Sequence, residues 1–595
     1  MAGVGHTAPA TEVSSSKRRE YINPIIPGWN SDPSCVFVKE HDNTLFCTTS
    51  SFLAYPGVPV YACKDFTNWK LASHAIARPD QLPELATSGG GPGQQSEGIW
   101  ASTIRYRNGT FYLITSYNNW RPWSPKILLF RTTDPFKDGW EGPLRMEDPG
   151  DDIDPDLFWD DDGKAYVSVA AGIYIWEADL TTGKAIGDTF KVWNGTGDRN
   201  PEGPHLYKKD DFYYLLIGEG GTETNHSVTI ARSKSIRGPY EGYEKNPILT
   251  AKNTDNYYQT VGHADLFEDA SGNWWTVALS TRSGPEWLNY PMGRETVLTP
   301  ATWKKGEWPV IEPVRGKQSG PLPPINRKVP GSGPWIDEPD VVDFRPGSAL
   351  PRQFVHWRIP KEDLFTISPP DHPNALRMSP SRVNLTSDAT YQPTEEGLGF
   401  IARKQTSTKF SFSVNLSFKP TTSSGEAGIT VFLTQLQHID LSIVNLPGSS
   451  DNKTLAPHLK FGVEASGKPN ETVPETNTIP IPRSWLSHPI NLKVEAVDEY
   501  KYVFSAASTN HASQVVRVGD ADATIVSGGS GPFTGKLWRL KEGFAKLILT
   551  GTLVGAFNTK NGNEAETAPA YFSRWIYTPI AQAVDEGVYV SASHN

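Results

Sequence analysis

One short pattern occurs five times in the first half of the chain. Each copy has a small or charged residue, a short apolar run, a turn rich in Asp, Asn and Gly, and an aromatic run. The copies begin at Ser31, Trp100, Ile153, Pro201 and Gly262. Turns such as RNG, DDDG and ASGN suit β-hairpins because these residues tolerate positive φ. Runs such as TFYLITS and AYVSVA have the β-branched and aromatic residues typical of strands.

The repeat length predicts the architecture of this half. The equivalent positions are Asp32, Ala101, Asp154, Glu202 and His263, which lie 48 to 69 residues apart. A blade of four strands with loops needs about this much chain, so residues 21–312 are predicted to form a five-bladed β-propeller. The alternative is a β-sandwich whose hairpins are similar by coincidence. In a propeller the innermost strands start at the central channel, so these polar side chains should converge there.

The second half has a different character. Residues 313–347 contain eight prolines and are predicted to be an extended linker. Segments such as FSFSVNLSFKP, ITVFLTQL and INLKVEAV then alternate between apolar and polar residues. Alternation is typical of strands with one buried face, so residues 348–595 are predicted to form a β-sandwich. Residues 1–20 are expected to form a disordered tail. The expected fold class of the whole chain is all-β.

Composition restricts the partners and the compartment. The net charge of −10 lacks the basic footprint of nucleic-acid binding, and the longest apolar stretch is too short to span a bilayer. The first twenty residues lack the apolar core of a signal peptide. Seven N-x-S/T sequons nevertheless favour a secreted protein without its leader, at Asn108, Asn194, Asn225, Asn384, Asn415, Asn452 and Asn470. Cys35, Cys47 and Cys63 allow one disulfide or none, and their state stays open.

The converging acids point to one kind of chemistry. Hydrolysis of a glycosidic bond needs one protonated carboxyl for the leaving oxygen and one ionised carboxyl for water or the anomeric carbon. A third anion nearby raises the pKa of the acid, because like charges disfavour ionisation. Asp32, Asp154 and Glu202 together meet this requirement.

Five motifs in order resemble glycoside hydrolase family 43, of the fungal α-L-arabinofuranosidase and β-xylosidase type. SDPS, IDPDLFWDDDGKAY and PEGPHLYKK resemble its catalytic segments, which implies Asp32 as base, Asp154 as modulator of pKa and Glu202 as acid. PMGRETVL implies that Arg294 contacts sugar hydroxyls. VGHADL resembles the segment of an axial histidine, His263, which lies near a central calcium ion or water in some members. The resemblance therefore implies no required cofactor and leaves a structural Ca²⁺ open.

The sequence leaves the substrate undecided between two sugars. The first expectation is an inverting, exo-acting α-L-arabinofuranosidase on arabinoxylan, extending to doubly substituted xylose. The alternatives are a β-D-xylosidase acting on xylo-oligosaccharide ends, a bifunctional enzyme, and, more remotely, a non-catalytic sugar-binding propeller. Phe52, Trp100 and Trp120 are candidate platforms for the sugar, with packing inside the propeller as the other explanation for the first two.

Overall fold

The computed structural model describes residues 18–87, 95–119, 123–148, 150–170, 172–387, 396–448, 451–468, 471–528 and 550–592. Strands form nearly all of the regular structure in these ranges. The helical elements there are short 3-10 turns at Lys39–His41, Pro79–Gln81, Pro83–Ala86, Glu362–Leu364, Arg483–Trp485 and Ala523–Val526. Within the described ranges, no helix is long and apolar enough to cross a membrane.

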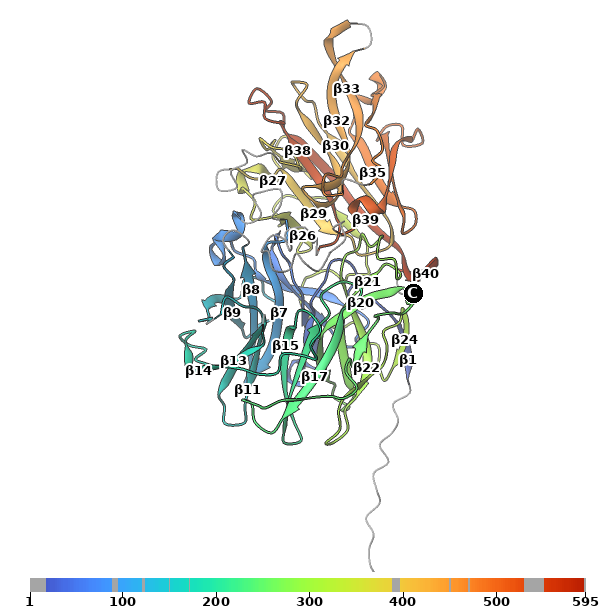
Figure 1. Cartoon of the computed structure of the whole chain (residues 1–595). Helices are drawn as coiled ribbons and strands as arrows, with labels where there is room; N and C mark the ends of the chain where they lie inside the picture. Colours follow the sequence, from blue (N-terminus) through green and yellow to red (C-terminus); the bar gives the residue numbers. More distant parts are fainter. Residues whose placement is uncertain are drawn as a thin grey trace, which may run out of the picture.

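Five antiparallel sheets form the blades of a β-propeller, which confirms the predicted fold of the first half (Figure 1). The first three blades are β2 (Ser34–Val38), β3 (Thr44–Thr48), β5 (Gly57–Cys63) and β6 (Lys70–Ile76); β7 (Gly98–Arg107), β8 (Thr110–Asn118), β9 (Lys126–Thr132) and β10 (Glu141–Arg145); and β11 (Ile153–Trp159), β12 (Ala165–Ala170), β13 (Tyr174–Ala178) and β14 (Ala185–Lys191). The last two are β15 (Glu202–Lys209), β16 (Phe212–Glu219), β17 (Ser227–Ser233) and β18 (Glu241–Gly242), with β19 (Leu249–Thr250) beside β17; and β20 (Tyr258–Glu268), β21 (Trp274–Arg282), β22 (Glu295–Thr302) and β23 (Val310–Ile311).

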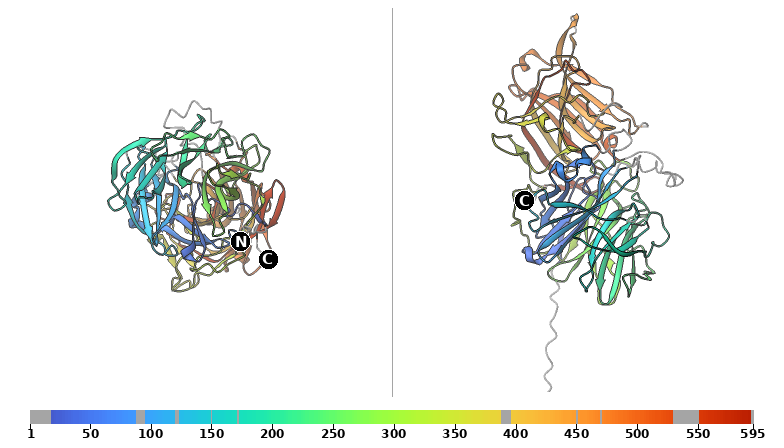
Figure 2. Two further views of the ribbon diagram at one scale, coloured as in Figure 1. Left: turned by 90° about the horizontal axis from the view of Figure 1, so that it is seen from below. Right: turned by 90° about the vertical axis from the view of Figure 1, so that its left-hand side faces the viewer.

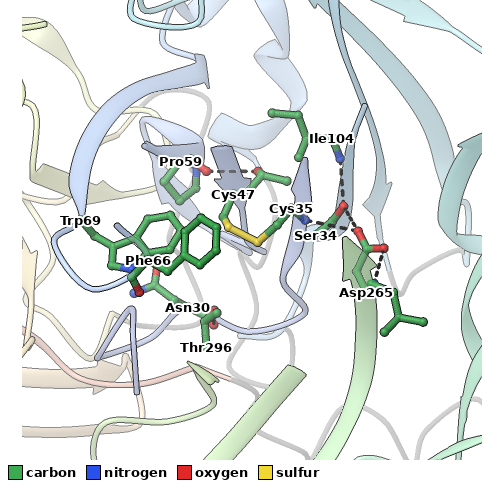
Figure 3. Close-up of a disulfide and its surroundings, with 12 residues drawn as sticks. Asn30, Ser34, Cys35, Cys47, Pro59, Phe66, Trp69, Ile104, Asp265 and Thr296 are labelled. Atoms are coloured by element: carbon green, nitrogen blue, oxygen red, sulfur yellow. Dashed lines mark hydrogen bonds between the residues drawn. A yellow bond between two sulfur atoms is a disulfide. The ribbon is translucent and has the colours of Figure 1, made fainter. Parts of the chain in front are cut away.

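The hairpin turns account for the blade pattern. Asn108 and Gly109 join β7 to β8 with φ of 50° and 81°, the left-handed conformation that a tight hairpin turn requires. In the first blade a disulfide joins Cys35 of β2 to Cys47, its directly opposite partner on β3, whereas Cys63 is free and buried (Figure 3). The disulfide state that the sequence left open is therefore one bridge and one thiol.

Two further sheets form the predicted β-sandwich. One contains β25 (Asp340–Val342), β27 (Phe365–Ile367), β28 (Leu376–Met378), β30 (Lys409–Ser417), β35 (Ile490–Ala496), β36 (Lys501–Ser508), β37 (Val516–Asp522), β39 (Ala570–Asp585) and β40 (Val588–Ser591). The other contains β26 (Phe354–Trp357), β29 (Phe400–Lys404), β31 (Glu426–Thr434), β32 (Gln437–Gly448), β33 (Asp451–Glu464), β34 (Asn477–Pro480), β38 (Leu553–Thr559) and β4 (Ala54–Tyr55). Strand β30 alternates strictly between buried and half-buried residues, as its sequence predicts.

The boundaries between the parts differ from those expected from the sequence. Residues 1–17 of the predicted tail lie outside the described residues, but β1 (Arg19–Ile22) already pairs with β24 (Lys317–Gly320). The predicted linker is therefore ordered along the propeller rather than freely extended, and its strand β25 already belongs to the sandwich. Proline-rich composition shows only that a segment avoids helices and central strands, which docked and free segments do equally.

The sandwich lies against one end of the propeller (Figures 1 and 2). Strand β4 leaves the first blade and pairs with β26, through the partners Tyr55–His356 and Ala54–Trp357. One buried hydrophobic cluster also combines propeller residues such as Trp29 with sandwich residues such as Phe432. Strand pairing and a shared core hold the two domains together as a unit.

A buried ion pair strengthens this contact. Arg282 of β21 forms two hydrogen bonds with Glu295 of β22, at 2.6 and 2.9 Å. The same guanidinium donates to Thr408, Gln582 and the carbonyl of Ala583 in the sandwich. Its side chain is 3% exposed and that of Glu295 is 0% exposed, so both charges depend on each other for solvation.

We expect Glu295→Gln to lower the free energy of unfolding by about 3–5 kcal/mol, because it leaves the Arg282 charge buried without its counterion. Denaturation with guanidinium, followed by intrinsic fluorescence, measures this loss. The matched control is Glu312→Gln, which breaks the exposed Arg18–Glu312 pair and should cost about 0–1 kcal/mol. Equal costs for the two variants would contradict a special role for the buried pair.

Candidate active site

In four of the five blades, the innermost strand is irregular where it approaches the axis. The pairing register shifts between Ile99 and Ser102, Ile153 and Asp156, Glu202 and His205, and Gly262 and Asp265. Positive φ occurs within these irregularities at Asp154 (52°), Gly203 (55°) and His263 (46°), and in the first blade at Asp32 (53°), shortly before β2. A bulge redirects the side chain at that point, and such strain persists only where the surroundings fix it. The repeat therefore turns one side chain per blade toward a common place.

Seven of the eight predicted site residues line one cavity. They are Asp32, Phe52, Trp100, Asp154, Glu202, His263 and Arg294, and the cavity also contacts Ala101, Ile153 and Thr222. Trp120 lies outside the described residues. The members come from all five blades, so residues up to 262 positions apart meet in one pocket.

Asp32 is held as an anion. Its side chain is 6% exposed, and Arg294 donates from Nη1 to Oδ1 at 3.0 Å and from Nη2 to Oδ2 at 3.2 Å. Ser50 Oγ donates to Oδ2 at 2.5 Å. Burial raises the pKa of Asp32, but the charge of Arg294 and the hydrogen bonds outweigh it, so that its pKa lies below the ordinary value. An ionised, rigidly held carboxylate can act as a general base.

Asp154 and Glu202 interact with each other, and their pKa values are shifted in opposite directions. Burial raises the pKa of Asp154 well above its ordinary value, and the charges of Glu202 and Asp32 raise it further. Glu202 is also affected by burial, but contacts with His226 and His263 leave its pKa below the ordinary value. Because the two carboxyls interact, the ionisation of each affects that of the other.

His263 lies directly beside Asp32. Its Nδ1 is 3.8 Å from Asp32 Oδ1, and its ring packs against Gly203, where any Cβ would lie 2.8 Å from the imidazole. Burial lowers the pKa of His263 to about 4, despite the opposing charges of Asp32 and Glu202. At neutral pH this histidine is therefore an uncharged group in the pocket floor.

Aromatic side chains form one wall of the cavity. The rings of Phe52 and Trp100 are 6.3 Å apart, and Trp100 also contacts Trp123 at 6.0 Å. Phe52 is 1% exposed and Trp100 is 6% exposed, and both also belong to the shared hydrophobic cluster. Both therefore line the cavity and pack in the core at once, so the two sequence-based explanations apply together.

A second polar layer lies farther along the innermost strands. Arg105 of β7 contacts Asp156 at 2.7 Å and Asp265 at 2.9 Å, and it donates to His205 at 3.1 Å. Ser34 Oγ and Tyr207 OH complete the hydrogen bonding of Asp265, at 2.7 and 2.6 Å; Figure 3 shows Ser34 between Asp265 and Ile104. Burial raises the pKa values of both acids, but the Arg105 charge outweighs it and keeps them low.

The sandwich contacts the segments that carry the pocket residues. Thr552 donates its amide to Pro291, and a Cβ on Gly293, which precedes Arg294, would lie 2.7 Å from the Cα of Gly551. Strand β26 also pairs with β4, which begins two residues after Phe52. The second domain therefore supports the positions of Arg294 and Phe52.

Three site residues were not identified from the sequence. Ser50, Thr222 and His226 lie in connections from the second to the third strand of a blade, and Phe52 and Arg294 lie in equivalent connections. Thr222 Oγ1 accepts a hydrogen bond from Arg294 at 3.0 Å. The repeat pattern marks the first strand of each blade, whereas these connections vary in length and share no motif. Each of these connections places polar residues next to a strand with aromatic residues. This is the signal that could have identified Ser50, Thr222 and His226.

The arrangement matches known proteins in both domains. Residues 21–309 match the family model of glycosyl hydrolases family 43, and residues 341–578 match that of the beta-xylosidase C-terminal concanavalin A-like domain. The chain is 32% identical over 438 residues to a non-reducing end alpha-L-arabinofuranosidase of Bacteroides ovatus, covering 73% of this chain and 78% of that protein. It is 34% identical over 447 residues to a xylosidase/arabinosidase of Butyrivibrio fibrisolvens, covering 71% and 79%.

A solved structure shows the same two-domain arrangement. The crystal structure of a xylan beta-1,4-xylosidase from Bacillus halodurans superposes with a TM-score of 0.78 at 26% identity, covering 94% of this chain and 100% of that one. The match therefore extends over the propeller, the pocket and the sandwich. On the strength of both family models and these relatives, the chain belongs to glycoside hydrolase family 43.

Proposed function

We propose that this chain is an inverting, exo-acting glycosidase that releases α-L-arabinofuranosyl side chains from arabinoxylan, including those on doubly substituted xylose units. The observation that carries the proposal is the unequal surroundings of three carboxyls in one buried pocket. Arg294 forms an ion pair with Asp32 and holds it as an anion, whereas burial and the charges of Glu202 and Asp32 raise the pKa of Asp154. A base and an acid at one site are the equipment of glycosidic bond hydrolysis.

In this mechanism each carboxyl has one task. Asp32 accepts a proton from the attacking water, and Glu202 donates a proton to the leaving oxygen. Asp154 lies beside Glu202 and modulates the pKa of this acid through its charge. The raised pKa of Asp154 itself helps the two carboxyls to keep a proton. For single displacement, the carboxyls of Asp32 and Glu202 should lie roughly 6.5–9.5 Å apart to leave room for water.

We favour arabinose over xylose for two reasons. A relative is named an arabinofuranosidase, and the sandwich supports the positions of Arg294 and Phe52 in the pocket. The relative from Bacteroides ovatus is named an arabinofuranosidase acting at the non-reducing end. A β-D-xylosidase is the second candidate, favoured by the likeness of both domains to a xylan beta-1,4-xylosidase. The relative from Butyrivibrio fibrisolvens carries both names, which is consistent with one pocket accepting both pentoses.

Secretion is part of the same proposal. The Cys35–Cys47 disulfide suits an oxidising compartment. Four of the sequon asparagines are exposed, namely Asn108, Asn194, Asn225 and Asn384. Both features support a secreted enzyme that meets its polysaccharide outside the cell.

The donor set on the axis does not fit Ca²⁺. Calcium takes six to eight oxygen ligands, but both oxygens of Asp32 are bound by Arg294. Farther along the axis, Arg105 bridges Asp156 and Asp265. The described residues contain no group of three or more acidic, His or Cys side chains arranged to hold a metal ion. We therefore propose that the Arg105 guanidinium supplies the axial positive charge and that no metal is required.

The substrate assignment is tested by product analysis. We expect wheat arabinoxylan to yield arabinose as the main monosaccharide, and xylobiose to yield xylose much more slowly, measured by anion-exchange chromatography. Proton NMR of the first-formed sugar should show inverted anomeric configuration. Xylose from xylobiose without arabinose from the polymer would transfer the assignment to the xylosidase, and retention would exclude single displacement.

The charge of Arg294 should set the acidic limb of the pH profile. Without it, burial raises the pKa of Asp32, so Arg294→Met should move the acidic limb of kcat/KM upward by about 1–3 pH units. Arg294→Lys keeps the charge and should leave the limb closer to that of the wild type. An unmoved limb in the Met variant would contradict Asp32 as the base.

Metal independence is tested with chelator-treated protein. Ca²⁺ should change neither the activity nor the melting temperature of the wild type. Arg105→Ala is the control, because it leaves Asp156 and Asp265 unpaired at a cost of about 3–5 kcal/mol, and added Ca²⁺ should partly restore its melting temperature. A rise of several degrees in the wild type would overturn the proposed role of Arg105.

A further inference from the structure

A fully buried histidine outside the predicted site contacts the proposed general acid. His226 is 0% exposed and directly precedes β17, in the connection that also carries Thr222. Its Nε2 is 3.4 Å from Glu202 Oε1. This buried Nε2 has no hydrogen-bond partner among the described atoms, and the carboxyl of Glu202 is the charged group recorded next to it.

The tautomer of His226 follows from its second contact. Its Nδ1 lies 3.0 Å from the carbonyl oxygen of Thr260. A carbonyl only accepts hydrogen bonds, so Nδ1 carries a hydrogen. The remaining nitrogen, Nε2, therefore carries a lone pair and accepts hydrogen bonds in the neutral ring, and it is a donor in the charged ring.

Two glycines make the slot that fixes this ring. A Cβ on Gly262 of β20 would lie 2.4 Å from the imidazole, and a Cβ on Gly218 of β16 would lie 3.2 Å from Nε2. Neither position accepts a larger residue without moving His226. The ring is thus held between two strands with its Nε2 directed at Glu202, which is the geometry of a fixed partner rather than of loose packing.

The contact between Nε2 and Oε1 requires one proton. If Glu202 is ionised and His226 neutral, two lone pairs face each other across 3.4 Å. One proton removes this conflict, either on Glu202 and donated to Nε2, or on Nε2 and donated to Glu202. Because both groups bind it, the loss of this proton is a property of the pair rather than of Glu202 alone.

We propose that His226 is a positioning residue that holds, jointly with Glu202, the proton destined for the leaving group. The inference rests on the proposed function, because it assigns the acid role to Glu202. During turnover the shared proton passes from Glu202 Oε to the glycosidic oxygen as the bond to the anomeric carbon breaks. The attacking water gives its proton to Asp32, and solvent exchange returns one proton to the Glu202–His226 pair.

The other titratable groups around His226 are less suited than Glu202 to share its proton. The second imidazole nearby, His263, is kept neutral by burial, with its pKa near 4. Asp154 and Asp32 act on Glu202 through their charges, from β11 and from the segment before β2. Asp32 is already neutralised by Arg294, which leaves Glu202 as the carboxyl next to His226.

Two substitutions separate the proton from the geometry. His226→Asn can keep the hydrogen bond to Thr260 but loses the contact with Glu202. His226→Gln can place an amide near the former Nε2 but cannot take up a proton. We expect both to move the alkaline limb of kcat/KM by about one pH unit or more, with KM changed less than kcat. A glutamine variant with the wild-type limb would overturn the shared proton.

The leaving group provides the second readout. Aryl glycosides of the same sugar with good leaving groups need little protonation, so both variants should lose about tenfold or more on poor leaving groups and little on good ones. Glu202→Gln is the benchmark. If this variant shows no dependence on the leaving group, the proposed acid role fails. If it does and the His226 variants lose activity equally on all substrates, the proposal for His226 fails.

A measurement on the unmodified enzyme covers the case in which the variants do not fold. Histidine ¹⁵N shifts of the full chain, assigned by comparison with Glu202→Gln, report the protonation of His226 across pH 5–10. A protonation profile of His226 that changes when Glu202 is replaced by Gln supports the shared proton. The same profile in both proteins would overturn it.

Discussion

Carboxylates from separate blades meet on one axis, and their mutual repulsion is the constraint on which the rest of the pocket depends. Buried like charges persist only with counterions or with a proton. Arg294 pairs with Asp32, and Arg105 pairs with Asp156 and Asp265, whereas no arginine of the described residues forms an ion pair with Asp154 or Glu202. In the proposed mechanism, this unequal distribution of cations is what distinguishes the base from the acid.

The sandwich contributes to that distribution although none of its described residues lines the cavity. It contacts Gly293 beside Arg294, and it pairs with β4 after Phe52. Arg282 links Glu295, the residue after Arg294, to Thr408 and the end of β39. The position of the cation that ionises Asp32 therefore depends on contacts made by both domains.

Much of the fold was predictable because its signals are local. Hairpin turns such as Asn108–Gly109 and the alternation in β30 depend on a few neighbouring residues, and the repeat then defines five blades. The linker was harder, because proline content does not reveal that β24 pairs with β1 and β25 with β39. The Cys35–Cys47 bridge likewise depends on strand register, which three cysteines in a sequence do not specify.

The sequence by itself determined the blade repeat, the equivalence of Asp32, Asp154, Glu202 and His263, and the likeness to one family of glycosidases. Only the tertiary structure decided which carboxyl pairs with an arginine and which has its pKa raised by burial. Protonation depends on burial and on charges a few ångströms away, and those neighbours come from chain segments as distant as 262 residues. The tertiary structure also places His226 next to Glu202. The sequence could not predict this contact, because a connection between strands carries no periodic signal and its partner is defined only when the blades close around the axis.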